Sequence, residues 1–146
     1  MINVFDVAAY ILSKIGETTT MKLQKLVYYC QAWSLAWDDV PLFEEECQAW
    51  AAGPVFPTLY NKHRGQFKIG GPNSTTLPVS GTSFQTSQLA TMDTVLEYYG
   101  DKEPHWLSEL THKEAPWRKA REGVALGEQS QNIISKESMR DYYISL

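Results

Sequence analysis

The stretch MKLQKLVYYCQAWSLAW, residues 21–37, decides the fold of this chain. One helical stripe runs through Leu23, Leu26, Cys30 and Trp37, and tyrosines, alanines, a tryptophan and a leucine crowd the other sides. A helix that is apolar on nearly every side lies at the centre of a domain, because each side packs on a neighbour. The stretch therefore predicts a central helix over about 21–37.

Segments with helical periodicity or capping residues lie on both sides of this stretch. Asn3 with Asp6 starts a first helix that ends at Gly16, and Ser135 caps a last helix that ends near Ser145. Four further helices are expected, from Pro54 or Pro57 to about Arg64, from Thr82 or Ser83 to 99, at 104–112, and after Pro116.

The remaining segments predict short strands and a loop. Residues between Phe43 and Trp50 alternate in character, which predicts a short edge strand. A stretch rich in Gly, Pro, Ser and Thr predicts a long surface loop at about 65–82. We expect a single domain over 1–146: a mainly α, compact helical bundle around a central apolar helix at about 21–37, with two or three short β-strands.

Composition excludes several classes of protein. A hydrophobic fraction of 43% and a charged fraction of 21% are those of a globular chain and not of a disordered one. Proteins dedicated to binding nucleic acid usually carry a basic face, whereas this chain has a net charge of −4. We therefore expect no nucleic-acid partner. No run approaches the roughly 20 apolar residues of a membrane span. Two cysteines make no disulfide framework, and we expect a cytoplasmic protein.

A search for catalytic or metal-binding patterns finds none. The three histidines, His63, His105 and His112, are not spaced like zinc ligands on a helix. Cys47 follows three glutamates, which disfavour an activated thiolate. We therefore expect no enzyme, no catalytic residue, no metal and no cofactor. An enzyme with an unrecognised site around Trp50, His63 and His112 stays open as an alternative.

The chain is rich in aromatic residues, with five tryptophans and eight tyrosines. Adjacent tyrosines recur at 28–29, 98–99 and 142–143. Neighbours on a helix point about 100° apart, so we expect at most one of each pair to lie deep in the core. The other tyrosine serves either a binding surface or ordinary amphipathic packing, and both readings stay open.

Several blocks of the chain resemble the SocA-like antitoxin family, whose domain is called Panacea. The first block is Met21–Leu26, followed by Tyr28-Tyr29 and Gln31–Trp33. The other blocks follow in the family's order, at Asp6–Ala8, Tyr10–Leu12, Pro41–Phe43, Ala49-Trp50, Gly53–Val55, Leu59-Tyr60, Thr111-His112, Glu114 and Pro116-Trp117.

The resemblance implies an antitoxin of a type II-like toxin–antitoxin system of phages or prophages. Such a protein neutralises a cognate toxin, encoded by the adjacent gene, by direct protein–protein binding. The alternative implied partner is an ATP-dependent protease, to which the chain would deliver the toxin as an adaptor. The family-signature residues are expected to be structural: Lys22, Leu23, Gln24, Lys25, Leu26, Tyr28, Trp33, His112, Pro116 and Trp117.

We expect the toxin to dock on the segment between Glu45 and Tyr60 and on the exposed edge of the central helix. Trp50 offers an aromatic anchor beside a rigid turn, and an edge strand would offer unpaired backbone groups. The alternative is that Trp50 fills the core. The candidate toxin-binding residues are Glu44, Glu46, Trp50, Gly53, Pro54, Tyr60 and Lys62.

Overall fold

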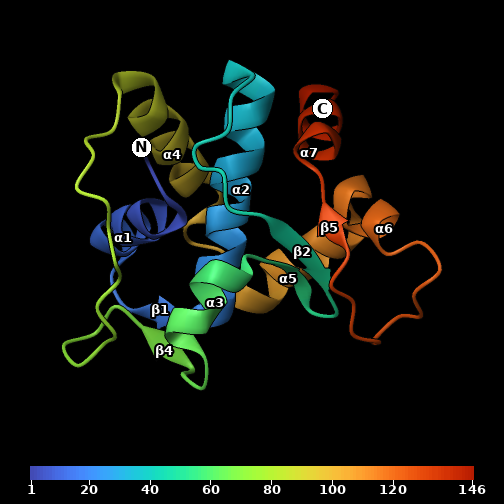
Figure 1. Cartoon of the computed structure of the whole chain (residues 1–146), viewed down its shortest axis with the longest axis horizontal. Helices are drawn as coiled ribbons and strands as arrows, with labels where there is room; N and C mark the ends of the chain where they lie inside the picture. The colour runs from blue at the N-terminus through green and yellow to red at the C-terminus, as the bar shows by residue number, and fades with distance from the viewer.

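The computed structural model describes residues 1–146 and confirms a mainly α fold built around one central helix. That helix, α2 (Thr20–Asp38), runs through the middle of the molecule (Figure 1). It packs on α1 (Val4–Ile15) and α4 (Thr86–Tyr99), and on α5 (Pro104–Lys113) and α7 (Lys136–Ile144). The remaining elements are α3 (Pro57–His63), α6 (Ala115–Ala120), β1 (Thr18–Thr19), β2 (Cys47–Trp50), β3 (Gly53–Val55), β4 (Lys68–Ile69) and β5 (Ile133–Ile134).

Helix α2 is buried along most of its length, because α1, α4, α5 and α7 pack around it. Tyr28 and Tyr29 are therefore both buried, and the expectation that one of them would face outward is wrong. On α4, which has an open side, the expectation is confirmed: Tyr98 is 60% exposed and Tyr99 only 6%. No helix in the structure has both the length and the apolarity needed to span a membrane.

Strand β2 is the middle strand of a three-stranded antiparallel sheet, in the order β3-β2-β5. Gln48 pairs with Val55 on one side and with Ile133 on the other. The expectation of an edge strand is wrong, because β5 arrives from the far end of the chain and covers the second edge. The backbone of β2 is thus not free to bind a partner strand.

The first turn of α1 holds the long segment that precedes α4. Asn3 and Asp6 form the expected capping box, with Asp6 N donating to Asn3 Oδ1 at 2.9 Å and Asn3 N donating to Asp6 Oδ2 at 2.8 Å. The Asp6 carboxylate also accepts hydrogen bonds from the backbone N–H and the hydroxyl of Ser80. One carboxylate therefore both caps a helix and anchors the segment against it.

Two other parts of the chain differ from the expected boundaries. The segment at 65–82 contains β4, which pairs with β1 as a two-stranded sheet. Helix α4 begins after Gln85, which forms a capping box with Gln88, and not after Thr82 or Ser83. Thr82 is used elsewhere, because its hydroxyl accepts a hydrogen bond from the N-terminal amino group.

Candidate functional site

Trp50 and Tyr60 come together at the surface between β2 and α3. Their rings meet edge to face with centroids 4.8 Å apart, and both side chains are half-buried. Trp50 is neither fully in the core nor fully exposed. Together they border a hollow of about 170 Å³, whose other walls include Gln24, Lys25 and His63. We call this the Trp50–Tyr60 surface.

The start of β3 lies beneath this surface. Gly53 and Pro54 are buried, so they support the surface and are not themselves exposed. Gly53 has φ +124°, and a Cβ there would lie 2.5 Å from Lys25 Cε. The Lys25 ammonium donates to the Pro54 carbonyl at 3.2 Å. Only glycine allows β2 and β3 to approach the buried lysine so closely.

The structure does not bring every candidate toxin-binding residue to the Trp50–Tyr60 surface. Lys62 is exposed on α3, two residues after Tyr60. Glu44 and Glu46 are exposed before β2 and lie beside Lys136 at the start of α7. Lys136 pairs with the Glu46 carboxylate at 3.6 Å and donates to the Glu44 carbonyl. The two glutamates therefore form a separate acidic rim.

Most family-signature residues of α2 lie inside the protein. Leu23, Leu26 and Tyr28 are buried, whereas Lys22 and Trp33 are half-buried. The buried polar pair, Gln24 and Lys25, bonds the backbone of β3 and of the residue that follows it.

The other signature residues form a buried corner between α5 and α6. Pro116 and Trp117 are buried, and the His112 ring stacks on Trp117 with centroids 4.2 Å apart. The indole N–H of Trp117 donates to the Trp50 carbonyl at 2.8 Å, which ties this corner to β2. His112 Nε2 is buried without a hydrogen-bond partner, and burial lowers the pKa of His112.

Burial shifts the pKa values of the ionisable groups near the Trp50–Tyr60 surface in the direction that favours their neutral forms. Burial lowers the pKa of Lys25 to about 8, and it also lowers the pKa of His63. Burial raises the pKa of the Cys47 thiol, so this cysteine is a poor nucleophile. No group of three or more His, Cys, Asp or Glu side chains is placed to hold a metal ion.

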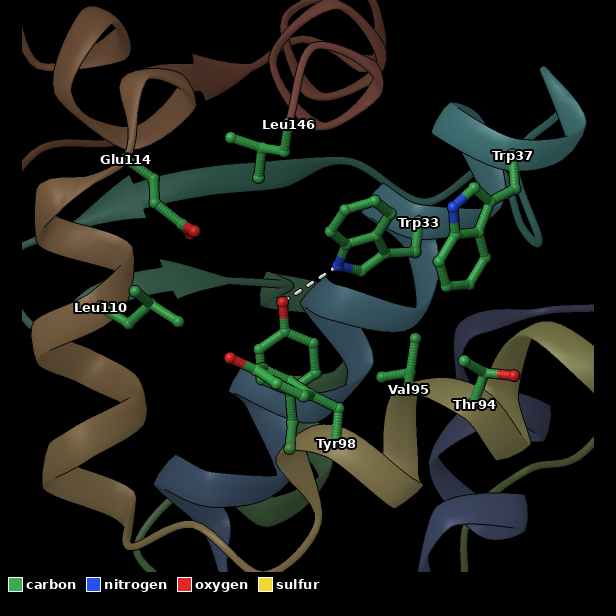
Figure 2. Close-up of a pocket in the computed structure, with 9 residues that line it drawn as sticks. Trp33, Trp37, Thr94, Val95, Tyr98, Leu110, Glu114 and Leu146 are labelled. Atoms are coloured by element: carbon green, nitrogen blue, oxygen red, sulfur yellow. Dashed lines mark hydrogen bonds between the residues drawn. The ribbon is translucent and has the colours of Figure 1, made fainter.

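A second, larger hollow lies on the opposite side of α2. Its volume is about 460 Å³, and aromatic side chains from α2 and α4 form most of its wall (Figure 2). The residues that line this aromatic pocket are Trp33, Trp37, Thr94, Val95, Tyr98, Tyr99, Leu110, Glu114 and Leu146. Sequence reasoning missed it, although the paired tyrosines at 98–99 were one visible signal.

Comparison with known proteins gives one match. The sequence profile of a family described as "Antitoxin SocA-like, Panacea domain" matches residues 23–118, well over half of the chain. The matched range runs from the first turns of α2 to α6, and it contains all residues that line the two hollows except Thr20, Met21 and Leu146. No curated protein and no solved structure matches the chain.

Proposed function

The chain belongs to the SocA-like antitoxin family with a Panacea domain, and on this basis we propose that it neutralises a toxin by binding it directly. The observation that carries the proposal is the family match over residues 23–118. The toxin is a protein encoded by the adjacent gene. Its activity is blocked because the antitoxin covers a surface that the toxin needs.

The proposed docking surface is the Trp50–Tyr60 surface together with Lys62 and the acidic rim of Glu44 and Glu46. An aromatic pair that is half-buried in its own protein can fill a partner's pocket without refolding, and tryptophan and tyrosine are enriched among residues that dominate binding energy. Trp50 is also held at two points: its indole N–H donates to Gln48 Oε1 at 2.8 Å, and its backbone carbonyl accepts from the indole N–H of Trp117 at 2.8 Å.

The structure favours binding over catalysis at this surface. Cys47 is buried and its thiol pKa is raised, so it offers no activated nucleophile. His63 shares a hydrogen bond with Gln24 inside the protein, 3.0 Å between nitrogens. The polar groups of this region are thus occupied in holding α2, β3 and α3 together.

Co-expression with the adjacent gene tests the proposal. With a tag on one protein only, the two chains should purify together and the co-expressing cells should grow. Trp50→Ala should weaken the complex by about 2 kcal/mol or more, roughly thirtyfold in Kd. Trp106→Ala is the matched control, because Trp106 is an exposed tryptophan on α5, away from this surface.

Charge reversals test the rim of the docking surface. Lys62→Glu and Glu44→Lys should mainly change the association rate, since rim charges steer encounter. Lys119→Glu, an exposed change on α6, should leave the rate unaltered. If the two chains never form a complex, direct neutralisation is wrong. If they do form a complex but growth is restored only in cells that retain their ATP-dependent proteases, the chain acts as an adaptor and neutralisation by binding alone is wrong.

A further inference from the structure

The aromatic pocket has an ordered wall of four rings. Trp33 and Trp37 pack on each other with centroids 4.8 Å apart, and Tyr98 and Tyr99 meet edge to face at 4.6 Å. The indole N–H of Trp33 donates to the Tyr99 hydroxyl at 3.0 Å and joins the two pairs (Figure 2). Trp37 is 50% exposed, so the wall opens to solvent.

A carboxylate lies at the inner end of this pocket. Glu114 is only 6% exposed, yet it lines the pocket, and Figure 2 shows its carboxyl group directed toward the aromatic rings. The hydroxyls of Tyr29 and Tyr143 both lie 2.7 Å from Glu114 Oε1 and donate to it. The other oxygen, Oε2, has no hydrogen-bond partner in the protein.

No cation of the protein neutralises this carboxylate. None of the ion pairs in the structure includes Glu114. The amine of Lys102 lies over the rings of Tyr98 and Trp106, 5.7 and 5.1 Å from their centroids, but Lys102 does not line the pocket. A buried carboxylate without a countercharge is costly, and a cation that enters the pocket would offset that cost, less the cost of its own desolvation.

We propose that the aromatic pocket binds an organic cation, an ammonium or guanidinium group carried on an apolar body. The faces of tryptophan and tyrosine attract such a cation, and Glu114 Oε2 supplies the opposite charge. The volume of about 460 Å³ lies in the usual range for small-molecule sites. The inference goes beyond the antitoxin role and does not depend on it.

Two probes of the same shape test this proposal directly. Choline and 3,3-dimethyl-1-butanol differ only in that a charged trimethylammonium replaces a neutral tert-butyl group. The indole N–H signals of Trp33 and Trp37 should shift on titration with choline, at constant ionic strength. The neutral alcohol should bind about tenfold more weakly or not at all. Equal binding of the two probes would overturn the proposal, because the pocket would then be merely apolar.

Two variants test the groups that would hold the cation. Glu114→Gln keeps an acceptor for the two tyrosine hydroxyls and removes the charge, and Trp37→Leu keeps an apolar side chain and removes the ring. Each should weaken choline binding by about tenfold. Trp106→Leu, an exposed tryptophan outside the pocket, is the matched control and should bind as wild type. Wild-type choline affinity in a folded Glu114→Gln protein would overturn the proposal.

A further set of binding measurements identifies the natural source of the cation. Lysine and arginine blocked at both ends are compared with blocked norleucine, which has the apolar stem alone. Tighter binding of a blocked basic residue than of choline assigns the pocket to a basic side chain of a partner protein. Tighter binding of choline assigns it to a free ammonium compound. These measurements use no toxin, so their failure leaves the proposed antitoxin function untouched.

Discussion

The side-chain amide of Gln24 bonds both polar groups of the Phe56 backbone. Phe56 N donates to Gln24 Oε1 at 2.9 Å, and Gln24 Nε2 donates to Phe56 O at 3.4 Å. Gln24 and Phe56 are both buried, so water cannot replace either bond. A glutamine on the central helix thereby takes the place of a neighbouring strand at the point where β3 passes into α3.

Gln24→Leu should destabilise the protein by about 2–4 kcal/mol. The leucine has nearly the volume of glutamine but leaves the Phe56 N–H and carbonyl buried without partners, each at about 1–3 kcal/mol. Chemical denaturation measures the loss. Gln131→Leu, at an exposed position, is the control and should leave the midpoint unchanged. An unaltered midpoint for Gln24→Leu would show that the Phe56 backbone finds other partners.

Acid should weaken the fold through His63. Gln24 Nε2 lies 3.0 Å from His63 Nε2, and because Nε2 of the amide can only donate, the histidine must be neutral to accept. Burial lowers the pKa of His63 in the folded protein below the ordinary histidine value of 6.5, so the unfolded chain binds more protons than the folded protein does. Stability due to this group is therefore complete above about pH 6.5 and falls as the pH drops further.

His63→Gln should flatten this acid dependence, because a glutamine oxygen accepts from Gln24 at every pH. The measurement is the free energy of unfolding between about pH 7 and 5 for both proteins. His105→Gln is the control, since His105 is exposed and pairs only with Glu109. A parallel loss of stability in wild type and His63→Gln would place the acid sensitivity elsewhere, with His112 as the next group to test.

Gly53→Ala should lower the free energy of unfolding more than Gly123→Ala does, although both glycines have a positive φ. Both Gly53 (φ +124°) and Gly123 (φ +85°) disfavour a side chain, but a Cβ at Gly53 would also lie 2.5 Å from Lys25 Cε, whereas nothing lies within 4 Å at Gly123. We expect a loss of about 1 kcal/mol for Gly123→Ala and of more than about 2 kcal/mol for Gly53→Ala. Equal thermal shifts would mean that the lysine stem moves aside freely.

Lys25→Met should stabilise the protein at neutral pH. Burial lowers the pKa of Lys25 from 10.5 to about 8, which corresponds to a destabilisation of about 3 kcal/mol when the lysine is charged in both states. The folded state binds fewer protons between these two values, so wild-type stability recovers as the pH rises from about 8 to 10.5. The advantage of the methionine variant should shrink over that window.

Lys22→Met on the same helix is the control for this pH series, because Lys22 is half-buried and reaches solvent. Its stability should differ from wild type by a constant amount across the window. A Lys25→Met protein that is less stable than wild type at pH 7 would show that the hydrogen bond to the Pro54 carbonyl outweighs the cost of burying the charge.

The central helix could be predicted from sequence because its pattern is local. Nearly every side of residues 21–37 carries apolar residues, and only a helix with neighbours around it can bury such a surface. The same is true of the capping box at Asn3 and Asp6, whose two partners are three residues apart. The position of β2 in its sheet could not be predicted, since β5 pairs with it from more than 80 residues away.

The aromatic pocket is also a product of contacts between distant residues. Trp33, Tyr98, Glu114 and Leu146 belong to different segments, and no short pattern joins them. Trp33 was expected in the core, yet it is half-buried because α4 leaves one of its sides open. The structural roles of Gln24 and Lys25 were easier to predict from sequence, because polar residues on an apolar helix need hydrogen-bond partners when they are buried. In the structure these partners are backbone groups of Pro54 and Phe56.

Leu146 lines the aromatic pocket and is 70% exposed, so it lies where the pocket meets solvent. A peptide joined after this residue would start within reach of the rings and would be held near them at an effective concentration in the millimolar range. A basic tail fused there would act as a tethered competitor and would hide the pocket from free ligands, whereas an acidic or neutral tail would leave it open. Leu146 is therefore a position at which the occupancy of the pocket can be set by covalent attachment.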